Sequence, residues 1–274
     1  MGGKQTAGSS ASRKNASRKN AGQAGQALAA RVEIRACRRL EEFERCVELQ
    51  RLVWGFADVD VAPSALFVVA AHTGGQIIGA YDGAEMIGFV LAFAGVRGKQ
   101  TFLHSHMAAV LPAYQNAGIG RRLKLAQRAD GLARGIRLVE WTFDPLEIRN
   151  AYFNLEKLGI IVRTYLLDVY GRTTSPLHAG LPTDRLLAEW WLDSARVEAR
   201  VAGRAVARAS SVERIRVPAQ IAAWRRSHPV MAERAQQEVR EQFQHWLAKG
   251  YAAVGFEMDA ASKDGIYLVA PYEG

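Results

Sequence analysis

The segment 108–134 constrains the fold of this chain more than any other stretch. An apolar run ends at Val110, and Pro112 stops it, because proline has no N–H to offer to the ladder of a sheet. A glycine pattern follows, Gln115-x-x-Gly118-x-Gly120, and after it the basic stretch 121–134 predicts a helix. A strand, a glycine-bearing turn and a helix N-terminus in this order form an anion site. The first N–H groups of such a helix are unpaired, and its dipole favours negative charge.

Two common phosphate-binding patterns do not fit these glycines. The segment lacks the Gly-Lys-Ser/Thr of a nucleoside-triphosphate loop and the G-x-G-x-x-G of a dinucleotide fold. It resembles the pyrophosphate-binding loop of the GNAT acyltransferase superfamily, where Val-x-Pro-x-aromatic precedes Gln/Arg-x-x-Gly-x-Gly/Ala. All of these positions are filled here, as Val110-x-Pro112-x-Tyr114-Gln115-x-x-Gly118-x-Gly120. An ordinary strand–turn–helix connection without a ligand is the alternative for the same residues.

The resemblance implies that this loop holds the diphosphate of acetyl-CoA, the expected acyl donor. Glycines let the backbone approach such a ligand without a Cβ in the way. Asn150, on the helix expected over 146–158, is a further candidate to bind the donor. The alternative is that it only caps the helix or faces solvent. The residues expected to bind the donor are Val110, Gln115, Asn116, Ala117, Gly118, Ile119, Gly120, Arg121 and Asn150.

Hydrophobic periodicity predicts strands and helices in the order of the same superfamily. The strands are expected over 32–36, 76–82, 86–94, 101–110, 138–143, 160–170 and 186–192, and the helices over 41–53, 64–71, 118–134 and 146–158. We therefore expect an α+β fold over 32–193, with a GNAT-like mixed, mostly antiparallel sheet flanked by helices. The run from Leu103 to Gly171 resembles a bacterial branch described only as predicted acetyltransferases, whose Trp-Thr-Phe-Asp-Pro-Leu-Glu pattern occurs here within the stretch from Trp141 to Gly159.

Residues 194–274 lie beyond the usual extent of that fold. Their pattern predicts a small C-terminal β-α-β-β extension, with strands over 213–217, 252–258 and 266–270 and an amphipathic helix over 230–249. The apolar face of this helix must cover its own strands, the first sheet or a second copy of the chain in a homodimer. The sequence does not choose among these three.

The net charge of +9 invites a nucleic-acid interpretation, but its distribution argues against one. Residues 1–31 contain six Lys and Arg and no acid, so they supply +6 of this charge. This segment is rich in Gly, Ser, Ala, Gln and Asn, and we expect a disordered basic tail. No apolar run reaches the roughly 20 residues of a membrane span, and Cys37 and Cys46 show no metal-type spacing. We expect a cytoplasmic protein with two buried thiols.

The resemblance also implies the chemistry, in which an amine attacks the thioester directly and CoA leaves as a thiolate. The usual acid of the superfamily is a tyrosine in Asn-x-x-Ala-x-x-x-Tyr-x-Lys-x-Gly. Aligned on Lys157 and Gly159, the place of that tyrosine is held by Leu155. Tyr152, about one turn earlier, is the candidate substitute at the thiolate, with packing at the rim as the alternative.

Two histidines are candidates for the base that takes the proton of the amine. His104 and His106 lie two apart on one predicted strand, so their side chains face the same way. Ordinary hydrogen-bonded histidines are the alternative. A His-x-His pair can begin a zinc site, but no third ligand follows at a suitable spacing, and we expect no metal. Glu140 and Asp144 are further carboxylate candidates at the next strand, and a turn and helix cap is the alternative for Asp144-Pro145.

The resemblance implies an N-acyltransferase that moves an acetyl or other short acyl group from acyl-CoA to an amine. The acceptor is expected to be the amine of a small molecule or a peptide, with no membrane partner. The missing tyrosine leaves a non-catalytic acyl-CoA sensor as one alternative. A nucleic-acid-associated protein recruited through the basic tail is another.

Overall fold

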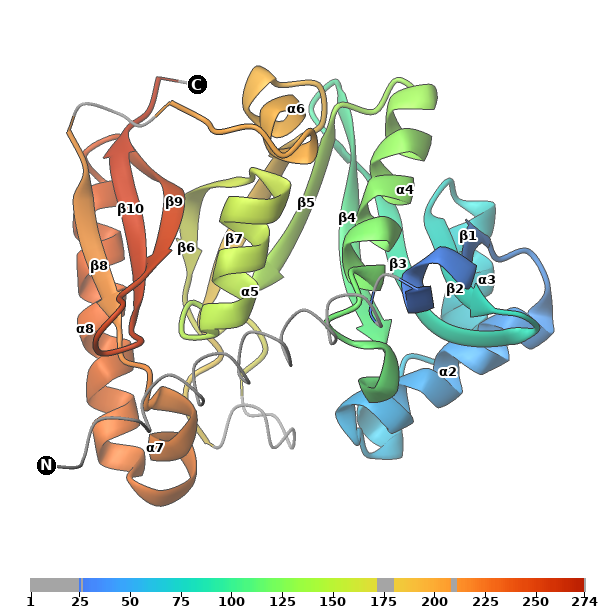
Figure 1. Ribbon diagram of the computed structural model, residues 1–274, viewed down its shortest axis with the longest axis horizontal. Helices are drawn as coiled ribbons and strands as arrows, with labels where there is room; N and C mark the ends of the chain where they lie inside the picture. The colour runs from blue at the N-terminus through green and yellow to red at the C-terminus, as the bar shows by residue number, and fades with distance from the viewer. Residues whose placement is uncertain (1–24, 26, 172–179, 208–210, 274) are drawn as a thin grey trace, which may run out of the picture.

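The computed structural model describes residues 25, 27–171, 180–207 and 211–273. Within them, ten strands form one sheet in the order β1-β2-β3-β4-β5-β7-β6-β9-β10-β8 (Figure 1). The strands are β1 (Val32–Ala36), β2 (Gln76–Asp82), β3 (Glu85–Arg97), β4 (Gln100–Val110), β5 (Leu138–Phe143), β6 (Ile161–Leu166), β7 (Arg185–Trp191), β8 (Glu213–Val217), β9 (Tyr251–Met258) and β10 (Gly265–Pro271). The α-helices are α2 (Leu40–Trp54), α3 (Ser64–His72), α4 (Ile119–Ala133), α5 (Ile148–Tyr152), α6 (Ala195–Val201), α7 (Ile221–Ser227) and α8 (Pro229–Leu247).

The strand pairs in the described sheet are antiparallel, with the exception of β4 and β5. These two strands run parallel and share only the pairs Leu103↔Val139 and His104↔Glu140. Beyond His104 they separate, and their carboxyl ends lie well apart in Figure 1. The expected α+β fold with a mixed, mostly antiparallel sheet is therefore confirmed.

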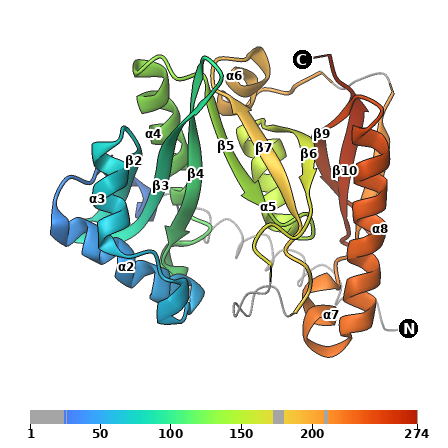
Figure 2. The ribbon, with the colours of Figure 1, turned by 180° about the vertical axis from the view of Figure 1, so that it is seen from behind.

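Helices cover both faces of the sheet at its first four strands. Helices α2 and α3 pack on one face, where Phe43, Phe67 and Phe89 share a buried cluster. Helix α4 packs on the other face and places Ile119 and Leu123 against Val90. Figures 1 and 2, which view the sheet from opposite sides, show the two layers. The apolar faces that the periodicity predicts are thus the faces that are buried.

Glycines in left-handed conformations mark the ends of the helix that follows β4. Gly118 precedes α4 with φ of 80°, and Gly135 follows it with φ of 73°. Such angles cost glycine little because it has no Cβ. A short 3₁₀ turn, η2 (Pro112–Tyr114), connects the end of β4 to this glycine. The strand–turn–helix connection expected from the sequence is confirmed.

The prediction of one helix over 146–158 is wrong in part. Asp144 Oδ1 accepts the N–H of Leu146 at 2.8 Å, which holds the chain in a turn, and α5 begins only at Ile148. From Phe153 to Leu158 the chain continues as a π-helix, η3, which ends at Gly159 with φ of 80°. The strand expected over 160–170 is also shorter, since β6 ends at Leu166 before the chain turns.

The C-terminal residues do not form only the expected β-α-β-β unit. Helices α6 and α7 were not anticipated, although Ser194 caps α6 by accepting the N–H of Val197 at 3.3 Å. A short 3₁₀ turn, η1 (Asp58–Asp60), was also missed. Strand β9 joins β6 at Val162↔Ala253, so the sheet continues into this region. Helix α8 buries its apolar face against β6, β8 and β9. Within one chain, this face therefore covers both the strands of its own region and a strand of the first sheet.

One buried ion pair ties this C-terminal region to the strand–turn after β5. Arg225 of α7 donates to Asp144 at 2.7 Å and to Glu147 at 3.2 Å. Tyr267 of β10 donates its hydroxyl to the carbonyl of Pro145 at 2.8 Å. Asp144 therefore stabilises a turn and pairs with Arg225. The Asp-Pro-Leu-Glu run of residues 144–147 holds the C-terminal region in place through these contacts.

Cys37 and Cys46 are buried free thiols, as expected. Among the helices that the structure describes, none has the length and apolarity needed to cross a membrane. For the tail expected to be disordered over residues 1–31, residues 1–24 and 26 lie outside the described residues, and the expectation is wrong for 27–31, which are helical.

Candidate active site

A cleft opens where β4 and β5 separate. Its volume is about 260 Å³, and α4 and the α5–η3 segment border it. Past His104, β4 has no ladder partner in β5 among the described residues, so that edge of its backbone faces the cleft. The lining residues are Ser105, His106, Met107, Ala108, Val110, Gly120, Leu123, Lys124, Trp141, Thr142, Phe143, Asn150, Phe153 and Asn154.

The predicted loop lies at the mouth of this cleft. A Cβ built on Gly118 or on Gly120 would meet no atom within 4 Å, so open space lies over both. Asn116, like Gly118, has a positive φ, of 62°. The side chain of Gln115 donates to the carbonyl of Val110 at 3.0 Å and closes the turn. An open concavity at the first turn of a helix fits an anionic diphosphate.

The predicted donor-binding residues take different positions around this mouth. Val110, Gly120 and Asn150 line the cleft, whereas Gln115, Asn116, Ala117 and Gly118 belong to the exposed or half-buried turn. The side chain of Ile119 is buried in the core, so only its backbone can face a ligand. Arg121 donates its guanidinium to the carbonyl of Val201 at 2.7 Å, which leaves its backbone as the group available at the loop. Their roles in donor binding stay predictions.

A β-bulge in β4 shapes the wall of the cleft. Leu91 of β3 opposes Met107, but the next residue, Ala92, opposes Ser105, so His106 is the extra residue. A bulge re-aims side chains and interrupts the ladder locally. The sequence carried no signal for it, since the apolar alternation of 101–110 fits an unbroken strand.

The two candidate bases lie on one face, as expected, with ring centroids 6.5 Å apart. Only His106 is among the lining residues of the cleft. Although His106 is exposed, desolvation by the surrounding protein and the nearby His104 lower its pKa. A lowered pKa keeps this imidazole neutral, and able to accept a proton, over more of the neutral range.

Glu140 is committed to other partners. It accepts two hydrogen bonds from Arg97, at 3.0 and 3.1 Å, and lies 3.8 Å from His104 Nδ1. Burial raises its pKa, but hydrogen bonds from His104 and Arg97 outweigh burial, and the net pKa is lowered. Glu140 therefore stays ionised and is a weak base.

Tyr152 does not line the cleft, although Asn150, Phe153 and Asn154 around it do. Its side chain is 37% exposed, and Lys157 Nζ lies 5.3 Å from its ring centroid. Leu155, at the place of the usual tyrosine, is fully buried in the core. A role for Tyr152 at the thiolate stays a prediction, and its placement speaks against it.

Sequence reasoning missed Lys124. It lies four residues after Gly120 on α4, and it is 6% exposed within the cleft wall. Desolvation lowers its pKa to about 7. The available signal was a lysine on the apolar face of a helix, one turn beyond the last glycine of the loop.

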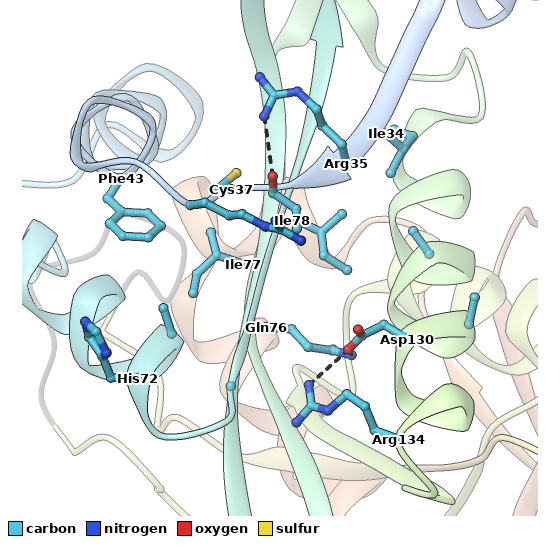
Figure 3. A pocket seen from close by; sticks show the side chains of 16 residues that line it. Ile34, Arg35, Cys37, Phe43, His72, Gln76, Ile77, Ile78, Asp130 and Arg134 are labelled. Carbon is cyan, nitrogen blue, oxygen red and sulfur yellow. Dashed lines mark hydrogen bonds and ion pairs between the residues drawn. The ribbon is translucent and has the colours of Figure 1, made fainter.

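A cavity larger than this cleft lies elsewhere. It has a volume of about 570 Å³ and sits at the β1 edge of the sheet, between α3 and the second half of α4 (Figure 3). Its charged groups contact their own neighbours: Asp130 accepts from Gln76 at 2.6 Å and from Arg134 at 3.0 Å. None of the predicted site residues lines it. Within the described chain, no group of three or more His, Cys, Asp or Glu is placed to hold a metal ion.

The known proteins and families that resemble this chain are the following. No curated protein sequence gave a significant match. Among solved structures, the chain is similar to the ribosomal-protein-S18-alanine N-acetyltransferase of Escherichia coli, with 16% identity and a TM-score of 0.47 over 60% of this chain and 96% of that one. It is also similar to Arabidopsis thaliana NAA60 in complex with acetyl-CoA, with 16% identity and a TM-score of 0.48 over 58% of this chain and 99% of that one. Residues 34–159, less than half of the chain, match the family model described as Acetyltransferase (GNAT) family.

Proposed function

We propose that this protein transfers an acetyl or other short acyl group from acyl-CoA to an amine by direct attack. The observation that carries the proposal is the cleft between the diverging strands β4 and β5, with an open glycine turn at its mouth. The match of residues 34–159 to the GNAT acetyltransferase family model supports the same reaction class.

The loop and the first turn of α4 position the donor in this proposal. The N–H groups of Ile119 and Gly120 have no partner earlier in the helix and receive the diphosphate. Open space over Gly118 and Gly120 lets the backbone approach the phosphates closely. The pantetheine arm then runs into the cleft between β4 and β5, whose backbones do not pair there.

The free edge of β4 supports the reacting carbonyl. Past His104 its amides have no β5 carbonyl to bond, and an amide aimed at the thioester oxygen stabilises the negative charge that develops there. Holding amine and thioester together in the cleft supplies the remainder of the rate enhancement through proximity.

His106 is the residue we propose as base. It lines the cleft, and its lowered pKa leaves the imidazole unprotonated at neutral pH. Partial exposure gives the proton a route to water. The acceptor is the amine of a small molecule or a peptide, and the two buried free thiols agree with action in the reducing cytoplasm.

Replacing Gly118 with valine tests the loop. At a φ of 80° a β-branched residue is strained, and its side chain fills the space over the turn. Isothermal titration calorimetry with acetyl-CoA should show at least about a tenfold loss of affinity, which is about 1.4 kcal/mol.

Gly98 to valine is the matched control for this experiment. Gly98 has a φ of 62° in the β3–β4 turn, also with nothing within 4 Å of a built Cβ, and lies outside the cleft lining. It should bind acetyl-CoA as the wild type does. Equal affinity for all three proteins would refute the loop assignment.

Thiol release separates an enzyme from a sensor. Wild-type protein mixed with acetyl-CoA and a panel of amines should liberate free CoA thiol, detected by a chromogenic disulfide. Binding of acetyl-CoA without thiol release from any amine would favour the non-catalytic sensor.

A further inference from the structure

Lys124 places an amine at the wall of the cleft that the reaction above leaves unused. Its side chain is 6% exposed and comes from α4, one turn beyond Gly120. Trp141 of β5 and Asn154 of η3 line the same cleft. Lys124 therefore faces the space between the diverging strands from the helix side.

The amine is held in one position by three contacts. Nζ donates to Ser105 Oγ at 2.7 Å and to Gln127 Oε1 at 3.0 Å. It also lies 3.8 Å from the ring centroid of Trp141, in a cation–π arrangement. These hydrogen bonds use two of the three N–H groups of an ammonium, so one remains for a group in the cleft.

Among the described residues, no carboxylate pairs with this ammonium. The described residues that line the cleft include no Asp or Glu, and His106 is the other titratable side chain among them. Gln127, its neighbour on α4, and Ser105 of β4 are neutral. Desolvation alone lowers the pKa of Lys124 to about 7, because burial disfavours the charged form. The lysine thus gives up its proton readily near neutral pH.

We propose that Lys124 is a catalytic residue of the acyl transfer, donating its Nζ proton to the CoA sulfur as the thioester bond breaks. This proposal rests on the function proposed above. Leu155 occupies the place of the usual acid, and Tyr152 lies outside the cleft lining, so the cleft needs another donor.

The step balances without an outside reagent. The amine nitrogen forms a bond to the acyl carbon and gives up a proton to His106, while the C–S bond breaks and its electron pair passes to sulfur. The Nζ proton joins that pair, which gives the free thiol and a neutral Lys124. A thiol of ordinary pKa, about 8.5, holds a proton more tightly than an amine of pKa about 7, so the transfer is favourable. Water then reprotonates the lysine.

The main test compares Lys124→Met with the wild-type full chain, using acetyl-CoA and the best acceptor from the amine panel. We expect a loss of roughly 100-fold in kcat, the usual range for a general acid, with unchanged acetyl-CoA affinity by calorimetry. Lys99→Met is the matched control, because Lys99 is exposed in the β3–β4 turn, and it should keep full activity.

The pH dependence separates proton donation from packing. The ratio of wild-type to Lys124→Met activity cancels the titration of the acceptor. This ratio should be constant below pH 7 and fall by roughly tenfold per pH unit above it, as Lys124 loses its proton. A ratio that stays constant across the whole range would overturn the proposal.

Ser105→Ala provides a second variant that keeps the amine. Removing the Ser105 hydroxyl deprives the ammonium of an acceptor at 2.7 Å, so the fall in activity should move to lower pH. Tryptophan fluorescence of the free protein gives an activity-independent readout. The difference between wild type and Lys124→Met should titrate near pH 7, because Trp141 contacts the amine. If the fluorescence difference between the two proteins does not change with pH, the assignment is contradicted.

Three further outcomes distinguish the inference about Lys124 from the proposed function on which it rests. Wild-type turnover together with full activity of Lys124→Met would reject the role of Lys124 alone. An acetyl adduct on Lys124, found by peptide mass spectrometry after incubation with acetyl-CoA, would also reject it, because the lysine would then be an acceptor. Wild-type protein that neither binds acetyl-CoA nor releases thiol would reject the proposed function itself.

Discussion

The buried carboxylate of Glu42 shows how one residue links α2 to the first strands. Its oxygens accept the N–H groups of Arg38 and Arg39 at 2.7 and 3.1 Å, the guanidinium of Arg35 at 2.6 Å and the hydroxyl of Tyr81 at 3.0 Å. Burial raises its pKa, but these hydrogen bonds together outweigh burial and lower it to about 2. The folded protein therefore holds Glu42 ionised where an unfolded chain protonates it.

This lowered pKa predicts acid sensitivity. Between pH 4.5, the ordinary pKa, and pH 2, the unfolded chain binds a proton that the native protein does not. The free energy of unfolding should fall by about 3 kcal/mol as the pH drops through this window. Urea unfolding at several pH values measures it. The pH dependence of Glu42→Gln should be shallower than that of the wild type by about this amount, whereas Glu41→Gln, exposed on the same helix, should keep the wild-type dependence.

At the site, residue types on one continuous segment were predictable and residues brought together by the fold were not. The glycines of the loop and the shared face of His104 and His106 follow from spacing alone. The cleft-lining position of Lys124, and the exclusion of Tyr152 from that lining, depend on how α4 and η3 pack against β4 and β5. No local pattern reports that packing.

At the scale of elements, long periodic segments were predictable and short ones were not. The strands β2 and β4 and the helices α2, α4 and α8 fall within a few residues of their expected bounds. Helices α6 and α7 have seven residues each, which is two turns and too short for a clear period. The contact of β9 with β6 rests on one residue pair, so it leaves no trace in the sequence.

The attachment of α7 gives a prediction at this scale. Arg225 is 7% exposed as a side chain and pairs with Asp144 and Glu147, so its removal leaves carboxylates without their cation. Arg225→Met should lower the free energy of unfolding by about 3 kcal/mol, the usual cost of breaking a buried pair. Chemical denaturation measures the loss. Arg226→Met, on the same helix and exposed, should change stability little, and equal effects would contradict this account.

At the scale of the whole molecule, one core crosses the expected boundary at residue 193. The same buried cluster includes Leu103 and Trp190 on one side and Phe243 and Tyr267 on the other. An apolar cluster shared in this way makes each part depend on the other for burial. The division into a domain over 32–193 and a C-terminal extension stays a prediction from the sequence.

Calorimetry tests this dependence. We expect one heat-absorption transition for the full chain, with equal calorimetric and van't Hoff enthalpies, because the two parts share their core. Two resolved transitions would instead indicate that residues 194–274 unfold as a unit of their own.

The two residue pairs between β4 and β5 have a consequence for the architecture as a whole. They join a group of four strands to a group of six, so the ten-stranded sheet is interrupted near its middle. A pantetheine arm that enters this gap stands where a further stretch of ladder would be. In the proposed reaction the acyl donor would thus take the place of a strand in a sheet that is already open at this point.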